Sequence, residues 1–128
     1  MPTSDILLFE IENHIATLTL NQPETRNSIS EFEMIDAIVS ACDELNQNPD
    51  IRVAILTGAG SAFCSGGNVK DMRDKKGMFS GTNDELADNY RNGIQRIPLA
   101  LSQVEIPLIA AVNGPAVGAG CDLTCMCD

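Results

Sequence analysis

Two segments of the sequence share one design, in which a short apolar run enters a glycine-rich turn and the turn enters a helix. The first segment covers residues 53–70 and the second covers residues 108–122. Glycine lets a backbone approach a ligand closely, and the first turn of a helix offers N–H groups without intrahelical partners. Two such ends aimed at one point would bind a developing oxyanion. The pattern therefore predicts an α/β protein whose two glycine-rich turns face a common ligand.

Nucleotide-binding motifs are the alternative interpretation of these glycines. A dinucleotide fingerprint needs glycine at the last position of its motif, but Leu123 and Phe63 occupy that position in the stretches that start at Gly118 and Gly58. A phosphate-binding P-loop needs Gly-Lys-Ser/Thr, which the sequence does not contain. The sequence therefore favours an oxyanion-binding arrangement over a dinucleotide fold.

The first half of the chain predicts a hairpin followed by a helix. Apolar and β-branched residues indicate strands at 6–11 and 14–20, with a turn at 12–13 and His14 at a strand edge. A helix is expected after this hairpin because Ser30 and Glu33 form a capping box, with Ile29 and Met34 as a hydrophobic staple. Its apolar face recurs at steps of three and four residues, at Phe32, Ile35, Val39, Cys42 and Leu45.

The second half predicts further strands and helices in alternation. A buried strand is expected at 52–57, and a second one at 107–112 is expected to be buried on both faces. Between them, Thr82 and Glu85 form a capping box, and Pro98 either kinks the helix or restarts it as a first-turn residue. An apolar helix is expected at 116–126. The buried face of the middle helix contains Leu86, Tyr90, Ile94, Ile97 and Leu101.

The charge of the chain argues against some classes of partner. Its 128 residues carry 18 acidic and 8 basic side chains, for a formal net charge of −10, whereas nucleic-acid and anionic-membrane binders need basic surfaces. No apolar stretch approaches the ~20 residues of a membrane span. Four bases lie close together in the sequence and would attract an anionic ligand, although a solvated helix end and loop is the alternative interpretation. These are Lys70, Arg73, Lys75 and Lys76.

The cysteines indicate a reducing compartment. They are five in number and lie in apolar contexts, which predicts reduced, buried thiols. A metal site at Cys121, Cys125 and Cys127 is the weaker alternative, because their spacing fits no common zinc motif. The first residues also lack the basic and apolar regions of a secretory signal. We therefore expect a cytoplasmic protein without a metal. The cysteines are Cys42, Cys64, Cys121, Cys125 and Cys127.

The two segments together resemble a known family. Residues 54–58 and 62–72 look like the first signature of the enoyl-CoA hydratase/isomerase (crotonase) superfamily, and residues 107–123 look like the second. Residues 21–27 are similar to an early loop of the family. The resemblance implies a crotonase-like spiral of ββα units, in which residues 1–128 form the N-terminal part of a single domain. It also implies that the full-length protein assembles as homotrimers or as hexamers built from two trimers.

The resemblance further implies a substrate and a site. The implied ligands are acyl-CoA thioesters, so coenzyme A is part of the substrate and no separate cofactor is expected. By position, the backbone N–H groups of Gly67 and Ala119 match the two oxyanion donors of the family. The stretch that matches the CoA contact contains Ser65, Gly67, Asn68, Val69 and Lys70, and Glu24 and Thr25 are expected at the nucleotide end.

Asp122 matches the position of the first catalytic carboxylate of the family. It lies three residues after Ala119, which places both on one face of a helix. The hydratases that the sequence resembles have glutamate there, whereas aspartate is more typical of the dienoyl-CoA isomerase branch. A structural role, in which Asp122 braces a neighbouring loop, is the alternative. A second catalytic carboxylate is expected beyond residue 128.

Three functions follow as hypotheses. The first is an enoyl-CoA hydratase, a lyase of fatty acid metabolism that adds water to a 2-enoyl-CoA. The second is an isomerase of the same fold that shifts the double bond. The third is a catalytically incomplete module that binds acyl-CoA without turnover. The sequence stops after an apolar helix without a glycine cap or a following strand, so we expect the front part of a longer domain, with little activity of its own.

Overall fold

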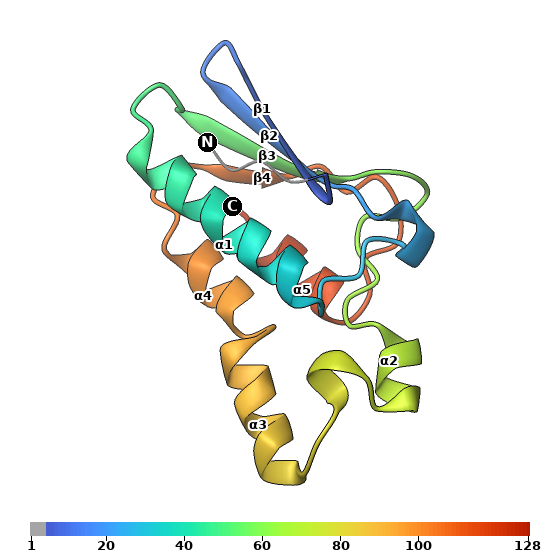
Figure 1. Cartoon of the computed structure of the whole chain (residues 1–128). Helices are drawn as coiled ribbons and strands as arrows, with labels where there is room; N and C mark the ends of the chain where they lie inside the picture. The colour runs from blue at the N-terminus through green and yellow to red at the C-terminus, as the bar shows by residue number, and fades with distance from the viewer. Residues whose placement is uncertain (1–4) are drawn as a thin grey trace.

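The fold is built on one mixed β-sheet, seen in a computed structural model that describes residues 5–128 (Figure 1). An antiparallel hairpin is followed by two strands that run parallel to its second strand, in the sheet order β1-β2-β3-β4. Parallel neighbours need a crossover connection, and helices provide it on both occasions. The strands are β1 (Leu7–Glu12), β2 (Ile15–Leu20), β3 (Val53–Gly58) and β4 (Leu108–Ala110).

The helices divide into a group that covers the sheet and a group that extends from it. Figure 1 shows α1, α4 and α5 together on one side of the sheet, with α2 and α3 projecting away from it. Short 3₁₀ turns precede α1 and join α2 to α3. The bounds are η1 (Pro23–Thr25), α1 (Phe32–Gln47), α2 (Val69–Asp74), η2 (Gly77–Phe79), α3 (Asn83–Asn92), α4 (Arg96–Ser102) and α5 (Ala119–Met126).

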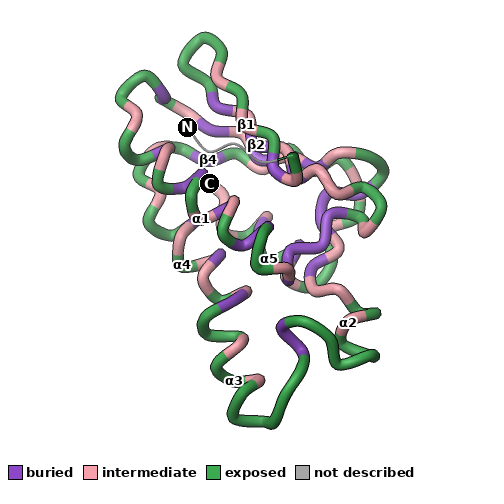
Figure 2. Tube along the Cα trace, viewed as in Figure 1, coloured by how far each residue is buried: buried purple, intermediate pink, exposed green. Residues whose placement is uncertain are grey.

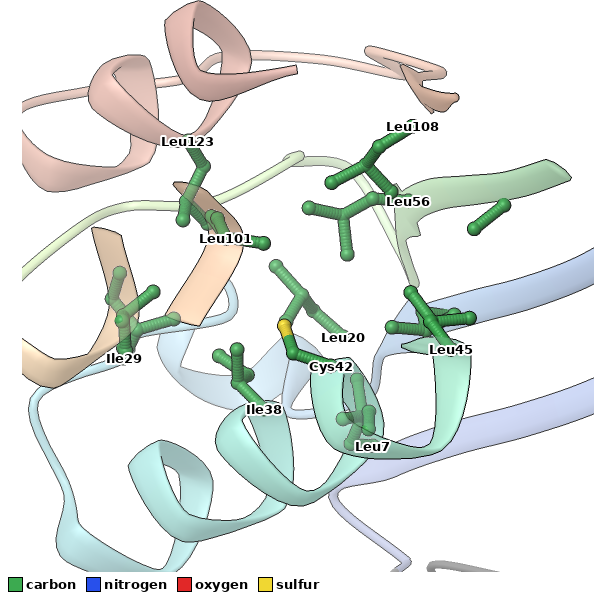
Figure 3. Close-up of a cluster of buried hydrophobic side chains, with 14 of the residues drawn as sticks. Leu7, Leu20, Ile29, Ile38, Cys42, Leu45, Leu56, Leu101, Leu108 and Leu123 are labelled. Carbon is green, nitrogen blue, oxygen red and sulfur yellow. The ribbon is translucent and has the colours of Figure 1, made fainter. Parts of the chain in front are cut away.

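The hydrophobic core lies between the sheet and the covering helices (Figures 2 and 3). Along β2 the alternation of apolar and polar residues buries every second side chain, as the sequence predicts. Leucines of the sheet meet the inner face of α1, which presents Ile38, Cys42 and Leu45 to them. This packing fixes the sheet and thereby the loops that leave the ends of β3 and β4.

The prediction that Ser30 and Glu33 form a capping box for α1 is wrong. The helix begins at Phe32, its N-cap residue is Glu31, and that residue makes no side-chain capping hydrogen bond. The buried Ser30 hydroxyl instead accepts a hydrogen bond from the Asn68 N–H at 3.0 Å. A tertiary partner has therefore replaced the local one. Phe32, expected on the buried face, is exposed.

The expectation that residues 107–112 are buried on both faces is also wrong. Only Leu108–Ala110 form the strand, and the side chain of Ile109 is 50% exposed. The reason is that the helices of the described residues cover one side of the sheet and leave the other open (Figure 1). Apolar residues on the open side of a strand give the same sequence pattern as residues buried on both sides.

The helix expected around residues 82–101 is two helices. The capping box of Thr82 and Glu85 is confirmed, with the Glu85 N–H donating to the Thr82 hydroxyl at 3.3 Å. The chain breaks at Gly93, where a Cβ atom would lie 2.7 Å from the sulfur of Met78. Pro98 lies in the first turn of α4, which confirms the expectation of a restart.

The cysteines and the hairpin turn differ in part from expectation. Cys42 and Cys64 are buried as predicted, but Cys121 and Cys125 on α5 are exposed, because α5 presents only one face to the core. The hairpin turn lies one residue later than expected, and His14 belongs to it with a positive φ of 67°. None of the helices in residues 5–128 combines the length and the apolar character that a membrane crossing demands.

Candidate functional site

The two glycine-rich turns lie against each other. The Val117 N–H donates to the Cys64 carbonyl at 3.0 Å, and Cys64 and Ala116 form an isolated parallel bridge. Gly66 has a φ of +83°, and a Cβ atom there would lie 2.6 Å from the Val117 carbonyl oxygen. A Cβ atom on Gly120 would overlap the Cys64 carbonyl. Both glycines are therefore required by the close approach of the two turns.

A cleft of about 420 Å³ opens between these turns and the segment from α2 to α4. Gly67, Ala119 and Asp122 all line it, so the structure brings together the three residues that the sequence assigns to catalysis. Most of the other lining side chains are apolar, and the ionisable ones among them are Asp122 and Tyr90. Its apolar wall contains Ile29, Val69, Met72, Met78, Phe79, Ile94, Ile97, Pro98, Val117, Leu123 and Met126.

A second, more polar chamber of about 440 Å³ adjoins this cleft. Ser65, Gly67 and Val69 line both chambers, so Gly67 lies where the apolar and the polar chamber meet. The polar chamber contains every residue that the sequence assigns to CoA contact, and also both residues expected at the nucleotide end. Its remaining lining residues are Glu24, Thr25, Arg26, Asn68 and Lys70.

Only part of the basic cluster lies at the polar chamber. Lys70 lines the polar chamber, whereas Arg73 is paired with its neighbour Asp74 at 2.9 Å on an exposed surface. Lys75 ends α2 in a left-handed conformation and is exposed. The chamber instead gains Arg26, which the sequence analysis did not single out. The sequence signal that could have identified Arg26 is its position directly after Thr25 in the early loop.

Both candidate oxyanion donors are free of protein acceptors. Among residues 5–128, neither the Gly67 N–H nor the Ala119 N–H donates a hydrogen bond to a protein atom. The carbonyl of each donor's peptide is occupied: Gly66 accepts from the Ile29 N–H at 2.9 Å, and Gly118 accepts from Cys121 at 2.9 Å. In a trans peptide the N–H points opposite to the C=O. Both residues line the same cleft, and within residues 5–128 neither N–H is engaged by a protein acceptor.

The far wall of the cleft comes from η2, α3 and α4. Phe79 and Tyr90 pack edge to face, with ring centroids 5.9 Å apart. The Asn89 side chain donates to the carbonyls of Met78 and Ser80 at 3.0 and 3.2 Å and so holds η2 against α3. Tyr90, expected on a helix face buried in the core, is exposed and lines the cleft, whereas Ile94 lines the cleft and also packs against the core. A helical period alone does not distinguish these two apolar environments.

The cysteines of α5 give no metal centre. Within the described part of the chain, no three side chains of the metal-binding types (His, Cys, Asp and Glu) come together. Burial raises the pKa of the Cys64 thiol to about 11 and that of Cys127 to about 11. Thiolates are the form that binds metals, so these raised values favour the protonated, unreactive thiol.

Comparison with known proteins identifies the family. A family model described as enoyl-CoA hydratase/isomerase matches residues 10–128. A probable enoyl-CoA hydratase (echA8) of Mycobacterium bovis is 34% identical over 126 residues, covering 98% of this chain and 45% of that protein. An (E)-benzylidenesuccinyl-CoA hydratase of Thauera aromatica is 36% identical over 120 residues, covering 93% of this chain and 43% of its own length. The chain therefore belongs to the enoyl-CoA hydratase/isomerase family.

Solved structures give the same fold. An enoyl-CoA hydratase of Mycobacterium smegmatis superposes with a TM-score of 0.84 at 31% identity, over 98% of this chain and 46% of that one. An enoyl-CoA hydratase/isomerase of Mycobacterium paratuberculosis gives 0.80 at 30% identity, over 100% and 49%. The predicted crotonase-like α/β fold is thus confirmed. The chain spans slightly less than half the length of the curated relatives named above.

Proposed function

We propose that the cleft binds an acyl-CoA thioester and adds water to a 2-enoyl-CoA. The observation that carries this proposal is the position of Gly67, which lines both the apolar and the polar chamber. An acyl-CoA has the same two-part character, with an apolar acyl chain on one side of the thioester and a polar, anionic CoA on the other. A thioester carbonyl at the junction would lie beside the Gly67 N–H.

The proposed chemistry rests on the two backbone donors. With the thioester carbonyl between the N–H groups of Gly67 and Ala119, the water oxygen adds to the β carbon while a carboxylate takes one of its protons, and the negative charge passes to the carbonyl oxygen as an enolate. A proton then adds to the α carbon and the carbonyl reforms. Fixed donors stabilise that charge without reorganisation, and one such donor contributes roughly 3–4 kcal/mol. No step needs a metal or a separate cofactor.

Asp122 is the proposed acid/base group of this chain. It lines the apolar chamber and lies on α5, the helix whose first residue is Ala119. A carboxylate there can orient the attacking water or transfer a proton to or from the substrate. Its side chain is one methylene shorter than the glutamate of the hydratases that the sequence resembles.

An isomerase is the second candidate, and the identity of residue 122 favours it. A double-bond shift needs one group that removes a proton at one carbon and returns it to another, and among residues 5–128 Asp122 is the only carboxylate that lines the apolar chamber. Asp122→Glu and Asp122→Asn separate the two functions. For a hydratase, Glu retains turnover of crotonyl-CoA and Asn loses it. Hydration that is unchanged in both variants would remove Asp122 from the chemistry.

The proposal extends to the setting of the protein. We infer a cytoplasmic enzyme of fatty acid metabolism that assembles as a homotrimer or hexamer and binds neither nucleic acid nor membranes. These statements rest on the family resemblance and on the net charge of −10. Light scattering on a longer protein that contains this chain tests the assembly, and a monomeric mass at micromolar concentration would contradict it.

Calorimetry on this chain and an absorbance assay on a longer protein that contains it test the function. Crotonyl-CoA is titrated into the chain to measure binding, and hydration by the longer protein is followed as loss of the enoyl thioester absorbance. Gly67→Pro deletes one donor N–H and is expected to abolish turnover, whereas Ala119→Gly keeps its donor and is expected largely to spare it. A melting curve excludes fold damage by proline. Binding without turnover would favour the binding-module hypothesis, and no binding would reject the proposal.

A further inference from the structure

Two methionines lie at different ends of the apolar chamber. Met72, on α2, reaches Gly67, because a Cβ atom built on Gly67 would lie 2.5 Å from the Met72 methyl carbon. Met78, on η2, reaches the break between α3 and α4, where a Cβ atom built on Gly93 would lie 2.7 Å from its sulfur. Gly67 lies at the junction with the polar chamber. Met72 is therefore the methionine at the end where an acyl group enters the apolar chamber.

A second apolar side chain approaches Gly67 beside Met72. The same Cβ atom on Gly67 would lie 3.6 Å from the ring carbon Cζ of Phe79. Both side chains line the apolar chamber and lie outside the polar one. Carbon atoms in van der Waals contact are about 3.5–4.0 Å apart. Even one carbon atom added beside Gly67 therefore overlaps the Met72 methyl group unless that side chain moves.

This narrow point coincides with one particular atom of the proposed ligand. With the thioester carbonyl beside the Gly67 N–H, the acyl carbon bonded to the carbonyl carbon is the first to enter the apolar chamber. A straight acyl chain has a CH₂ group there, whereas a branched one carries an additional methyl group. Overfilling a packed site is unfavourable. Met72 is 42% exposed and unbranched, so it can turn away, which keeps the penalty at the lower end of the usual range.

We propose that Met72 is a specificity-determining residue, which selects acyl-CoA thioesters that are unbranched at the carbon next to the thioester. This inference rests on the proposed function of the cleft. The selection acts on binding, since the side chain of Met72 contacts the acyl group and takes no part in the transfer of protons. It restricts the first acyl carbon and leaves the rest of the chamber, about 420 Å³ in all, to the remainder of the chain.

Two isomeric ligands test this selection. Butyryl-CoA and isobutyryl-CoA contain the same atoms and differ in where one methyl group is attached. Each is titrated into the full chain by calorimetry, with CoA alone as the reference. We expect butyryl-CoA to bind the wild type about fivefold more tightly or better, and this ratio to fall below about twofold in Met72→Ala, because the shortened side chain leaves space for the branch. A ratio near one in the wild type, or an unchanged ratio in Met72→Ala, would overturn the proposal.

Met126→Ala is the matched control. Met126 lines the same chamber, but it lies seven residues after Ala119 on α5, about 10 Å further along the helix. Removal of the same apolar atoms there is expected to weaken the binding of both ligands by a similar factor and to keep their ratio. An equal fall of the ratio in Met126→Ala and Met72→Ala would mean that any enlargement of the chamber admits the branch. That result would overturn the specific role of Met72.

The reference titration separates this inference from the function on which it rests. If the wild type binds butyryl-CoA no better than CoA alone, the acyl group has no site, and the proposed function and the inference fail together. If butyryl-CoA and isobutyryl-CoA both bind better than CoA, and equally well, the proposed function stands and the inference fails.

Met72→Leu covers the case in which Met72→Ala does not fold in a melting experiment. Leucine keeps the apolar volume but has a branched, less flexible end, so it turns away less easily than methionine. We expect the ratio of the two dissociation constants to stay at the wild-type value or to rise. A ratio that falls to near one in Met72→Leu would overturn the proposal.

Discussion

At the scale of single residues, Asn27 is a buried polar side chain that joins two segments of the chain by hydrogen bonds. It is fully buried, with a left-handed φ of 60°, and its amide group donates to the carbonyls of Ala62 and Phe63 at 3.0 and 3.2 Å. Its side-chain oxygen accepts from the Gln22 N–H at 2.9 Å. One side chain therefore holds the early loop against the strand-to-turn segment that leads to the site.

Replacement of Asn27 by alanine is expected to destabilise the fold. The change leaves the Phe63 carbonyl and the Gln22 N–H without the partner that Asn27 provides, and it puts alanine in a left-handed conformation that asparagine tolerates better. We therefore expect a loss of about 3 kcal/mol or more in the free energy of unfolding. Asn27→Gly loses the same hydrogen bonds without the backbone strain and should be less damaging by about 1 kcal/mol. Urea unfolding of both variants checks this, and equal losses would contradict the strain component.

The buried thiols predict a loss of stability at alkaline pH. Burial raises the pKa of Cys42 to about 12 and that of Cys64 to about 11, from a reference value of 9.0. The folded state therefore keeps protons that the unfolded state releases, so this contribution is complete below about pH 9 and declines above it. We expect the free energy of unfolding to fall between pH 9 and 11, and less steeply in Cys42→Ala. Stability that stays constant over this interval would contradict the assignment.

At the scale of elements, the sequence predicted local structure well and tertiary partners poorly. The hairpin, β3, α1 and the capping of α3 follow from patterns within a few residues. The capping of α1 did not, because the Ser30 hydroxyl bonds to Asn68, far away in the chain. The site residues Gly67, Ala119 and Asp122 came from matching two signatures, whereas Arg26 and the aromatic wall of Phe79 and Tyr90 depend on packing that no local pattern encodes.

The contact of α5 with the first glycine turn gives a prediction at this scale. Gly120→Ala would place a methyl group on the Cys64 carbonyl, so the helix must move and we expect about 1–3 kcal/mol of destabilisation together with loss of ligand binding. Gly118→Ala separates backbone strain from steric overlap: its φ of +57° and ψ of −124° strain a residue with a Cβ atom by roughly 1–3 kcal/mol, but nothing lies within 4 Å of the new atom. Thermal melts and calorimetry measure both. Retained binding in Gly120→Ala would contradict the close approach.

At the scale of the whole molecule, the sheet has one covered and one open face. One residue from each strand lies in a row of paired neighbours on the open side of the sheet. In the order of the strands these are Glu10, Thr17, Ile55 and Ile109. Ile15 and Ile109 are exposed there, whereas Leu18 and Leu56 on the other side are buried. For β4 the sequence pattern could not distinguish the covered face from the open face, because the residues on both faces are apolar.

The open face predicts binding of a hydrophobic dye. We expect 8-anilinonaphthalene sulfonate to fluoresce with the folded protein and the signal to fall in Ile109→Thr, which keeps a β-branched residue in the strand. Stability should change by less than about 0.5 kcal/mol because the side chain is exposed. Leu99→Gln removes an exposed leucine from α4 and serves as the control, with the signal expected to persist. A larger effect of Leu99→Gln would place the dye elsewhere.

The contact between the two glycine-rich turns also determines when the cleft can form during folding. Gly67 and Ala119 are distant in the chain, and the pairing of β3 with β4 and the contacts of residues 63–64 with residues 115–117 bring them to one cleft. A short fragment cannot form such a pocket. The entropy lost when the two distant turns are brought together is offset only by the contacts of the complete fold. A ligand that binds the cleft only in the folded protein would therefore raise the free energy of global unfolding.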